Sequence, residues 1–282
     1  MRNPYRSQNI AFAFLLLATL LIVVPVGAIV VIIVQKGLPA ITWGFLTDIP
    51  RQGMRAGGIF PAIVGTVYLV TGAVVFALPI GLLAAIYLSE YSKENILNRL
   101  IKLSIVNLAG VPSVVYGLFG LALFVVFFKF GASILSGSLT LGIMIIPIII
   151  TTSREALESV PQSFREVSLS LGASKWQTIR HIVLPNAVPG ILTGTILGLG
   201  RAAGETAPIL FTVAAFYLPQ LPTSIFDQAM ALPYHLYVIS TQVPNVDEKI
   251  RYGTALVLVS LVLFMNLVAI VIRSKFRKRK RW

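Results

Sequence analysis

Arg201 and Glu205 are the two charged residues in the otherwise uncharged segment 181–226. They lie four residues apart, so a helix would place both side chains on one face. An arginine at bilayer depth costs about 2.5–3.5 kcal/mol to insert and must face protein, water or a counter-ion. Its guanidinium matches the oxygens of a phosphate-like anion, which favours an anion pathway in which Glu205 competes for Arg201 and promotes release. The alternative is a structural ion pair that locks two helices together.

Small and hydroxyl-bearing residues extend this candidate pathway. Gly204 and Thr206 belong to the same segment, RAAGETAP. Ser113 and Tyr116, in the segment VPSVVYGLFG, could offer hydroxyl donors to a passing anion. Serine and tyrosine also form hydrogen bonds between membrane helices for structural reasons, so both roles stay open.

No other set of residues predicts catalysis or metal binding. The chain has no cysteine, and its two histidines, His181 and His235, lack a partner at a ligand-like spacing. No Ser/His/Asp set and no paired carboxylates converge on one segment. A G-x-x-x-x-G-K-[ST] phosphate loop is also absent, so we expect no nucleotide site on this chain.

The elements that carry these residues are predicted to be membrane-spanning helices. Hydrophobic residues make up 56% of the 282 residues and charged residues 12%, whereas soluble domains carry roughly a quarter charged residues. Stretches of about 20 apolar residues, the length that crosses a bilayer as a helix, recur along the chain. We therefore predict an all-α membrane protein with a single transmembrane domain over 1–282. The six expected spans lie near 10–34, 61–88, 104–128, 136–152, 187–217 and 252–272.

Basic residues set the expected orientation. With the N-terminus in the cytoplasm, most of the 23 lysines and arginines fall in cytoplasmic segments, as the positive-inside rule requires. Both termini are then cytoplasmic. The segment 181–226 could hold two short spans, but a seventh span would move the basic tail KFRKRKRW outside, so one long helix is favoured. The tail is expected to anchor on anionic lipid rather than bind nucleic acid. The first apolar stretch has no A-x-A-like cleavage site and is interpreted as a retained span.

The cytoplasmic loop 153–186 is expected to hold two short helices separated by Gly172. Pro161 can begin the first helix, and Ser163 with Glu166 can form a capping box. Pro185 is expected to end the second helix. A pair of helices with apolar side chains and little core of its own favours a partner protein as the contact, and an interfacial helix lying on lipid is the alternative.

This loop resembles the EAA loop of binding-protein-dependent ABC importer permeases. Glu166-Val-Ser is followed by Gly172 and then by Ile182-Val-Leu184-Pro185, where the family has E-A-A, a glycine and I-x-L-P. The two residues after Glu166 are a mild departure. The resemblance implies a MetI-like permease fold and a loop that sits in a groove of a cytoplasmic ATPase. It implies that ATP and Mg²⁺ are bound by that partner and that this chain binds no cofactor and is a non-catalytic subunit. The residues implied in ATPase docking are Glu166, Ser170, Gly172, Ala173, Leu184 and Pro185.

Three further segments look like the phosphate-specific permeases of this family, the PstA type. They are GGIFPAIVGT at 57–66, VPSVVYGLFG at 111–120 and GRAAGETAP at 200–208. The paired permease type, PstC, usually reads GETM where this chain has GETAP. The resemblance implies phosphate import across the bacterial plasma (inner) membrane. It implies a heterodimer with PstC, two copies of the ATPase PstB and an external phosphate-binding protein, PstS.

Two alternatives stay open from the sequence. The first is a permease of the same class for another oxyanion, sulfate or molybdate, because an external binding protein mainly selects the cargo. The second is a secondary transporter or channel. Such proteins usually show internal repeats and several intramembrane acids, whereas Glu205 is the one acid found within a predicted span.

Overall fold

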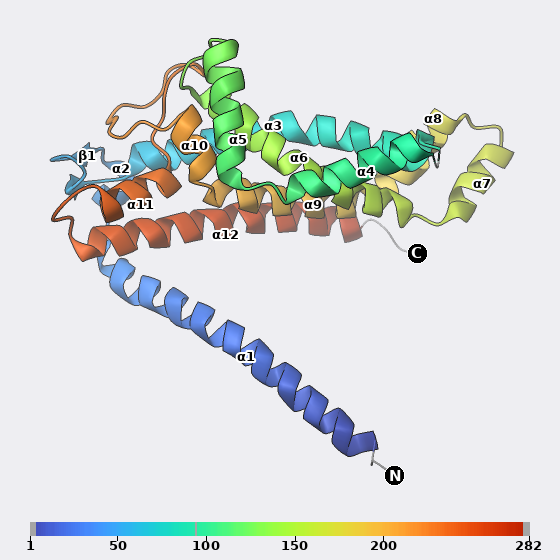
Figure 1. Ribbon diagram of the computed structural model, residues 1–282, viewed down its shortest axis with the longest axis horizontal. Coiled ribbons are helices and arrows are strands. Elements are labelled where there is room, and N and C mark those ends of the chain that lie inside the picture. The colour runs from blue at the N-terminus through green and yellow to red at the C-terminus, as the bar shows by residue number, and fades with distance from the viewer. Residues whose placement is uncertain (1–3, 94, 279–282) are drawn as a thin grey trace.

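Four long helices packed side by side form the body of the molecule. The computed structural model describes residues 4–93 and 95–278. Helix α3 (Phe60–Ile86) packs on α6 (Ile134–Glu158), α6 packs on α9 (Leu184–Gly204), and α9 packs on α12 (Glu248–Lys278) (Figure 1). In the described residues, five helices are long and apolar enough to cross a membrane, or six if one bent pair is counted as a span. The all-α membrane fold expected from the sequence is confirmed.

Small residues let these helices approach closely, as they commonly do in membranes. A Cβ atom on Gly81 of α3 would lie 2.7 Å from Ile149 of α6. On the opposite side of that contact, a Cβ on Gly142 would lie 2.6 Å from the ring of Phe76. The main hydrophobic core fills the space between α3, α6 and the short segments packed at one end of these helices.

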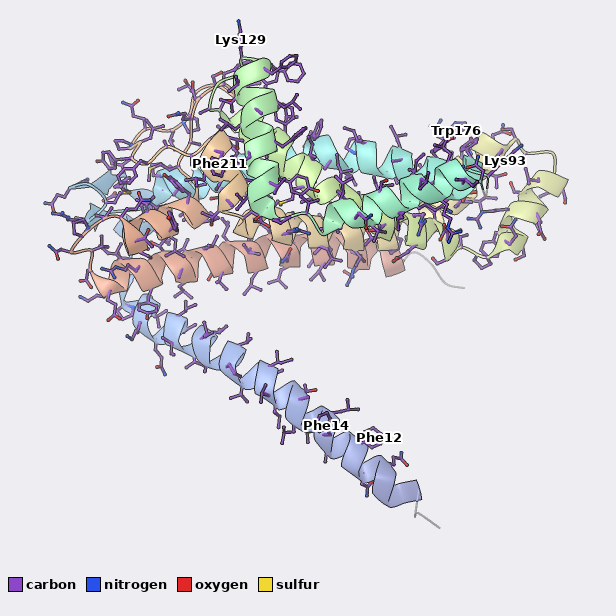
Figure 2. The ribbon with its side chains drawn as sticks, viewed as in Figure 1. Phe12, Phe14, Lys93, Lys129, Trp176 and Phe211 are labelled. Atoms are coloured by element: carbon purple, nitrogen blue, oxygen red, sulfur yellow. The ribbon has the colours of Figure 1, made fainter. Side chains whose placement is uncertain are left out.

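Helix α1 (Pro4–Gly37) stands apart from this bundle. It is in contact with α12 near Gly37, where an added Cβ would lie 2.8 Å from the carbonyl carbon of Tyr252. From there the two helices diverge, and α1 extends away with Phe12 and Phe14 exposed (Figures 1 and 2). No residue in its apolar window is buried. The bundle therefore does not depend on α1 for its core.

The expected span at 104–128 is broken in the structure. Helix α4 (Ile96–Ala109) is followed by α5 (Ser113–Gly120) and the π-helical η3 (Leu121–Phe127), and the two parts are bent by 100°. Pro112 is extended, with φ −59° and ψ 141°, and caps α5 without a side-chain hydrogen bond. Proline lacks an N–H and disfavours helix at the residue before it, so α4 cannot continue through this position. In Figure 1, α5 stands across the direction of the long helices.

One end of the bundle is built from short elements. Between α1 and α3 lie η1 (Leu38–Ala40), α2 (Trp43–Thr47) and a two-stranded antiparallel ribbon of β1 (Pro50–Arg51) and β2 (Ala56–Gly57). Between α9 and α12 lie α10 (Ala207–Thr212) and α11 (Leu232–Thr241). The Leu232 N–H donates to the Thr66 hydroxyl over 2.8 Å, which ties the start of α11 to α3.

The opposite end holds the loop between α6 and α9. The π-helical η2 (Tyr87–Tyr91) extends α3, and the loop contains α7 (Gln162–Ser170), α8 (Lys175–Thr178) and the π-helical η4 (Ile179–Val183). A second hydrophobic cluster, separate from the main core, lies at this end. The first described turns of α1 and the last of α12 point to the same end (Figure 1). The cytoplasmic orientation of the termini stays a prediction, and Arg2 and the basic residues 279–281 lie outside the described residues.

Candidate functional site

The helix that carries Arg201 ends just after it. Helix α9 stops at Gly204, Glu205 is extended with φ −79° and ψ 134°, and α10 begins at Ala207. The expectation of one long helix over 187–217 is wrong at this point. Pro208 has no N–H for the carbonyl of Gly204, four residues earlier, and its ring would clash with that carbonyl. The RAAGETAP segment is therefore a break between two helices, of the kind that occurs within membranes where it is buried in protein or lines a cavity.

Arg201 and Glu205 remain partners across this break. The Nε of Arg201 lies 3.7 Å from Oε1 of Glu205, which is longer than a strong charge-assisted hydrogen bond. Their side chains are 32% and 20% exposed. Arg201 lies in the last turn of α9, where the partial negative charge of the helix end favours a cation. The contact is loose enough to leave guanidinium N–H groups for another acceptor.

The pair is partly exposed on this chain. The cavity beside Glu205, lined also by Thr66 and Ala203, measures about 10 Å³ and is too small for an oxyanion. A Cβ on Gly204 would meet no atom within 4 Å. Thr206 precedes the first residue of α10 and is half-buried. If an anion reaches Arg201, it does so from the open side of the chain.

Helix α5 packs against α10 and so brings the second candidate segment to the first. A Cβ on Gly117 would lie 2.8 Å from the ring of Phe211 and 3.0 Å from the carbonyl oxygen of Ala207, and Phe211 is labelled in Figure 2. The buried Tyr116 interacts electrostatically with Arg201, while its hydroxyl donates to the Leu108 carbonyl over 2.8 Å. Ser113 is the first residue of α5 and is half-buried. The structure thus places Tyr116 near the pair and gives its hydroxyl a structural partner.

The expected docking loop has two short helices, as predicted, but their ends differ. Helix α7 begins at Gln162 with Pro161 as its N-cap, so Ser163 lies inside the helix and cannot cap it. The predicted capping box at Ser163 and Glu166 is wrong. The structure has a capping box at Ser174 and Gln177, at the start of α8. Buried hydroxyls of Ser168 and Thr178, 2.8 Å apart, join α7 to α8.

Gly172 separates the two helices in the left-handed region, with φ +84°. The Gly172 N–H donates to the Leu169 carbonyl over 3.0 Å, and the Ala173 N–H donates to the Ser168 carbonyl over 3.2 Å. These bonds satisfy carbonyls at the C-terminal end of α7. A glycine adopts this conformation without the steric cost that a side chain brings. The tight turn between α7 and α8 therefore depends on Gly172.

Pro185 does not end the second helix. Residues 175–204 form one candidate span in which α8, η4 and α9 follow one another without a gap. Pro185 is the second residue of α9 and directly follows the π-helical η4, so the helical backbone continues through it. The half-buried Leu184 packs against the second hydrophobic cluster.

The outer face of the loop is apolar and exposed. Val167, Leu171 and Trp176 are 60%, 83% and 50% exposed, and Figure 2 labels Trp176 at this end of the bundle. Glu166 and Ser170 lie on the exposed part of α7, where the Ser170 hydroxyl donates to the Glu166 carbonyl over 2.8 Å. Three large apolar side chains on a short loop form a surface of the kind that a partner covers.

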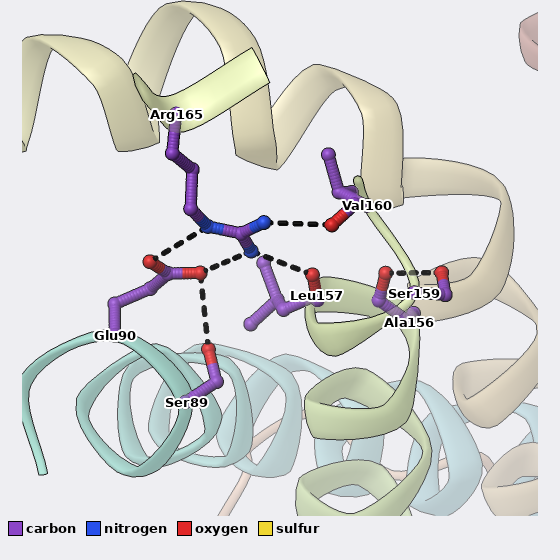
Figure 3. Close-up of polar contacts among 7 residues, drawn as sticks. All are labelled: Ser89, Glu90, Ala156, Leu157, Ser159, Val160 and Arg165. Carbon is purple, nitrogen blue, oxygen red and sulfur yellow. Dashed lines mark hydrogen bonds and ion pairs between the residues drawn. The ribbon is translucent and has the colours of Figure 1, made fainter. Parts of the chain in front are cut away.

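Glu90 and Arg165 form an ion pair at this end that the sequence did not indicate (Figure 3). They are 75 positions apart, so no local spacing points to them. The one available signal was Glu90 itself, an acid directly after the apolar stretch 61–88. Within the described residues, no group of three or more histidine, cysteine, aspartate or glutamate side chains could hold a metal ion.

Comparison with known proteins identifies a family. The family model for binding-protein-dependent transport system inner membrane components matches residues 77–282. A probable ABC transporter permease protein of Bacillus subtilis, YqgI, is 31% identical, over 91% of this chain and 91% of that protein. The phosphate transport system permease protein PstA 1 of Mycobacterium tuberculosis is 33% identical, over 98% of this chain and 90% of that protein. A probable PstA of Methanocaldococcus jannaschii is 35% identical, over 88% and 86%.

Solved structures agree on the fold. A chain of a bacterial ABC transporter that imports the polysaccharide alginate superposes with a TM-score of 0.64, at 16% identity, over 96% of both chains. A chain of the inward-facing MetNI methionine ABC transporter gives a TM-score of 0.60, at 16% identity, over 76% of this chain and 94% of that one. At this identity the likeness concerns the fold alone, which is that of ABC transporter membrane chains.

Proposed function

Because this chain belongs to the family of binding-protein-dependent transport system inner membrane components, we propose that it forms half of the membrane pathway of an ATP-driven phosphate importer. It is a non-catalytic, multi-pass permease subunit of the bacterial inner membrane. It works in an ABC transporter complex together with other permease and ATPase components. The phosphate cargo is supported by relatives named as phosphate transport permeases across nearly the whole chain.

The observation that carries the anion pathway is the helix break at Arg201. A guanidinium held only loosely by Glu205 on an open face of the chain offers donors to a second acceptor. Arginine suits a phosphate because its planar fork binds two oxygens at once. A pathway bounded on one side by this face is completed by the second permease, which we propose is of the PstC type.

The remaining partners follow from the loop between α6 and α9. We propose that its exposed apolar face docks on an ATPase dimer of the PstB type, which binds the ATP and Mg²⁺. Glu166, Ser170, Gly172, Ala173, Leu184 and Pro185 are the residues proposed to form or shape that contact. A phosphate-binding protein of the PstS type delivers the anion from outside. Closure of the ATPase dimer moves the loop, and the spans change between inward and outward openings.

The cargo is tested with the full complex reconstituted in vesicles that contain ATP. Labelled phosphate should accumulate with the external binding protein present, and labelled sulfate and molybdate should not. Accumulation of sulfate or molybdate in place of phosphate would assign another oxyanion. Uptake that needs an ion gradient and no ATP would instead place the chain in the class of secondary transporters.

The role of Arg201 is tested by Arg201→Gln in the same vesicles. Phosphate uptake should fall roughly 10- to 100-fold, because a hydrogen bond to a charged group contributes about 1.5–3 kcal/mol. Arg55→Gln, an exposed arginine in the turn between β1 and β2, is the matched control and should transport normally. Normal uptake by an assembled Arg201→Gln complex would reduce Arg201 to a structural partner of Glu205.

A further inference from the structure

A buried ion pair ties the docking loop to the end of α3. The Nε of Arg165 donates to Oε2 of Glu90 over 3.2 Å, and Nη2 donates to Oε1 over 2.7 Å (Figure 3). Two parallel bonds to one carboxylate are the geometry in which arginine holds its partner most firmly. The two side chains are 12% and 7% exposed, so solvent screens the pair little.

The same guanidinium also holds the end of α6. Nη1 donates to the carbonyl of Val160 over 2.7 Å, and Nη2 donates to the carbonyl of Leu157 over 2.9 Å. Carbonyls at the C-terminal end of a helix have no partner within the helix, so a side-chain donor satisfies them. One side chain of α7 thus joins α6 and η2, the π-helical extension of α3. Single π-helical turns are frequent where a functional side chain has to be aimed.

Hydrophobic contacts support this junction on its inner side. The second hydrophobic cluster includes Ile86 at the end of α3, Leu157 of α6, Ile179 of η4 and Ile191 of α9, and Phe164 of α7 packs against it. The three long helices α3, α6 and α9 therefore meet the loop in one small packed region. The ion pair of Arg165 and Glu90 lies at this junction.

The two faces of α7 carry different kinds of residue. Arg165 and the buried Ser168 face inward, whereas Val167 and Leu171 are exposed on the outer face. A force applied by a partner to the outer face of α7 is transmitted to the rest of the chain through the contacts of its inner face. The two hydrogen bonds between Arg165 and Glu90 are directional, so they resist a change in the angle between α7 and η2. Apolar contacts alone are not directional and would allow that change.

We propose that Arg165 and Glu90 are positioning residues that carry the motion of the docking loop into α3. They hold the loop, the end of α6 and the end of α3 as one rigid unit, so that a movement imposed at the loop displaces these spans rather than bending the loop. The inference rests on the proposed function only in assuming that a partner ATPase moves this loop.

The first experiment measures phosphate transported per ATP hydrolysed by the full complex in vesicles. Glu90→Gln and Arg165→Gln should lower this ratio at least roughly tenfold, because removing one partner of a buried pair is strongly destabilising to the junction. Arg165→Lys keeps the charge but lacks the fork that spans both oxygens and two carbonyls, so its ratio should lie between Arg165→Gln and the wild type. Glu158→Gln, which breaks the more exposed pair with Arg154, is the control and should keep the wild-type ratio.

A ratio for Glu90→Gln within the error of the wild type would overturn the proposal. So would a parallel loss of transport and hydrolysis with an unchanged ratio in Arg165→Lys, because that result is expected of a merely structural pair. If a variant complex does not assemble, the second experiment tests the role of the ion pair, because it can be done on this chain alone.

The second experiment measures the distance between spin labels at Ser163→Cys on α7 and Tyr87→Cys on η2. The chain has no cysteine, so this pair is labelled selectively in the isolated protein. The distance distribution should be narrow in the wild type and broad in Glu90→Gln. In the assembled complex, the wild-type distribution should be the same with and without ATP.

Equal widths in wild type and Glu90→Gln, or a wild-type distance that shifts with ATP, would refute a rigid unit. This readout does not depend on the cargo. A wild-type complex that fails to import phosphate would contradict the proposed function. The spin-label distances would then still test whether the ion pair makes the loop and α3 one rigid unit.

Discussion

Arg165 and Arg201 differ in burial and in hydrogen bonding, and these differences suit them to different roles. Arg165 is nearly buried, and four hydrogen bonds to Glu90, Leu157 and Val160 occupy its guanidinium. Arg201 is a third exposed and has one loose contact with Glu205. The first arginine is committed to structure, and the second keeps donors for a ligand. Arg201 could be singled out from the sequence because a charge within an apolar stretch is costly, whereas Arg165 is one of several basic residues in a predicted cytoplasmic loop.

Gly172 is predicted to be needed for its backbone rather than for its small size. An added Cβ would meet no atom within 4 Å, but the φ of +84° disfavours any side chain by about 1–2 kcal/mol. We expect transport to be highest with Gly172, lower in Gly172→Asn and lowest in Gly172→Val. Asparagine tolerates a positive φ better than valine, whose branched side chain is disfavoured there. The amount of protein in the membrane should stay the same in all variants. Wild-type uptake by Gly172→Val would show that the loop does not need this turn.

Asp227 is predicted to order the segment before α11. Its Oδ2 accepts the N–H groups of Thr223 and Ser224, each over 2.8 Å, and the Thr223 hydroxyl over 3.0 Å. These hydrogen bonds, that of the Thr223 N–H first, lower the pKa of the Asp227 carboxyl below its usual value. A lowered pKa means that this ordering is fully present above the unfolded pKa of about 3.9 and is lost as pH falls through the folded value.

A spin label at Ile225→Cys, an exposed position, reports this ordering. It should be immobilised from pH 7 to about pH 4 and should become mobile only as pH falls further, through the lowered pKa of Asp227. In Asp227→Ala it should be mobile at every pH. A label whose mobility is the same in both proteins would mean that Asp227 does not hold the segment.

At the scale of elements, two prolines decide where helices end. Pro112 lies between α4 and α5, and Pro208 is the second residue of α10, just after the end of α9. Pro79 and Pro147 lie inside α3 and α6, which continue through them. The sequence shows all four prolines alike. Which of them breaks a helix depends on whether neighbouring groups satisfy the carbonyl that a proline leaves free, and that is a property of the packed bundle.

Pro208→Ala is predicted to let α9 continue toward α10. Alanine restores the N–H that can bond the carbonyl of Gly204, and a proline within a helix costs about 3 kcal/mol relative to alanine. Spin labels at Leu197→Cys and Leu210→Cys should move to a separation of roughly 20 Å, that of a straight helix at about 1.5 Å per residue. Phosphate uptake should fall, because the open face beside Arg201 is lost.

Pro189→Ala is the matched control, because α9 already passes through Pro189 as a helix. It should leave both the distance and the uptake unchanged. If Pro208→Ala gives the wild-type distance, the break is imposed by tertiary packing rather than by the proline.

The helices themselves could be predicted because crossing a bilayer demands length and apolarity, and both are visible in the sequence. The turn at Gly172 was also visible, since a glycine between two short periodic segments has few other roles. A capping box at Ser163 fits the sequence pattern, but it requires a helix that begins at Phe164. Helix α7 begins two residues earlier, at Gln162, and the capping box lies at Ser174 and Gln177 instead. Helix ends depend on a residue or two of register, and apolar periodicity does not fix them.

For the molecule as a whole, contacts between distant segments were beyond the sequence. The packing of α5 on α10 brings Tyr116 close to Arg201, and no pattern in the sequence indicates that those two segments meet. The separation of the core into two clusters, one around Leu141 and Ile145 and one around Leu157 and Ile179, was likewise invisible. Hydropathy reports how deeply a segment lies in the membrane, and it carries no information on which neighbour it meets.

The isolation of α1 bears on how the chain is made. A helix with no buried residue in its apolar window has no tertiary contact to wait for, and its backbone groups bond within the helix. It can therefore reach its final form as soon as it enters the bilayer, while the ribosome is still adding the residues of α3. Its junction with the bundle, Gly37 against Tyr252, closes only after nearly the whole polypeptide has been synthesised. Helix α1 can thus form before the helix that it finally contacts, α12, has been synthesised.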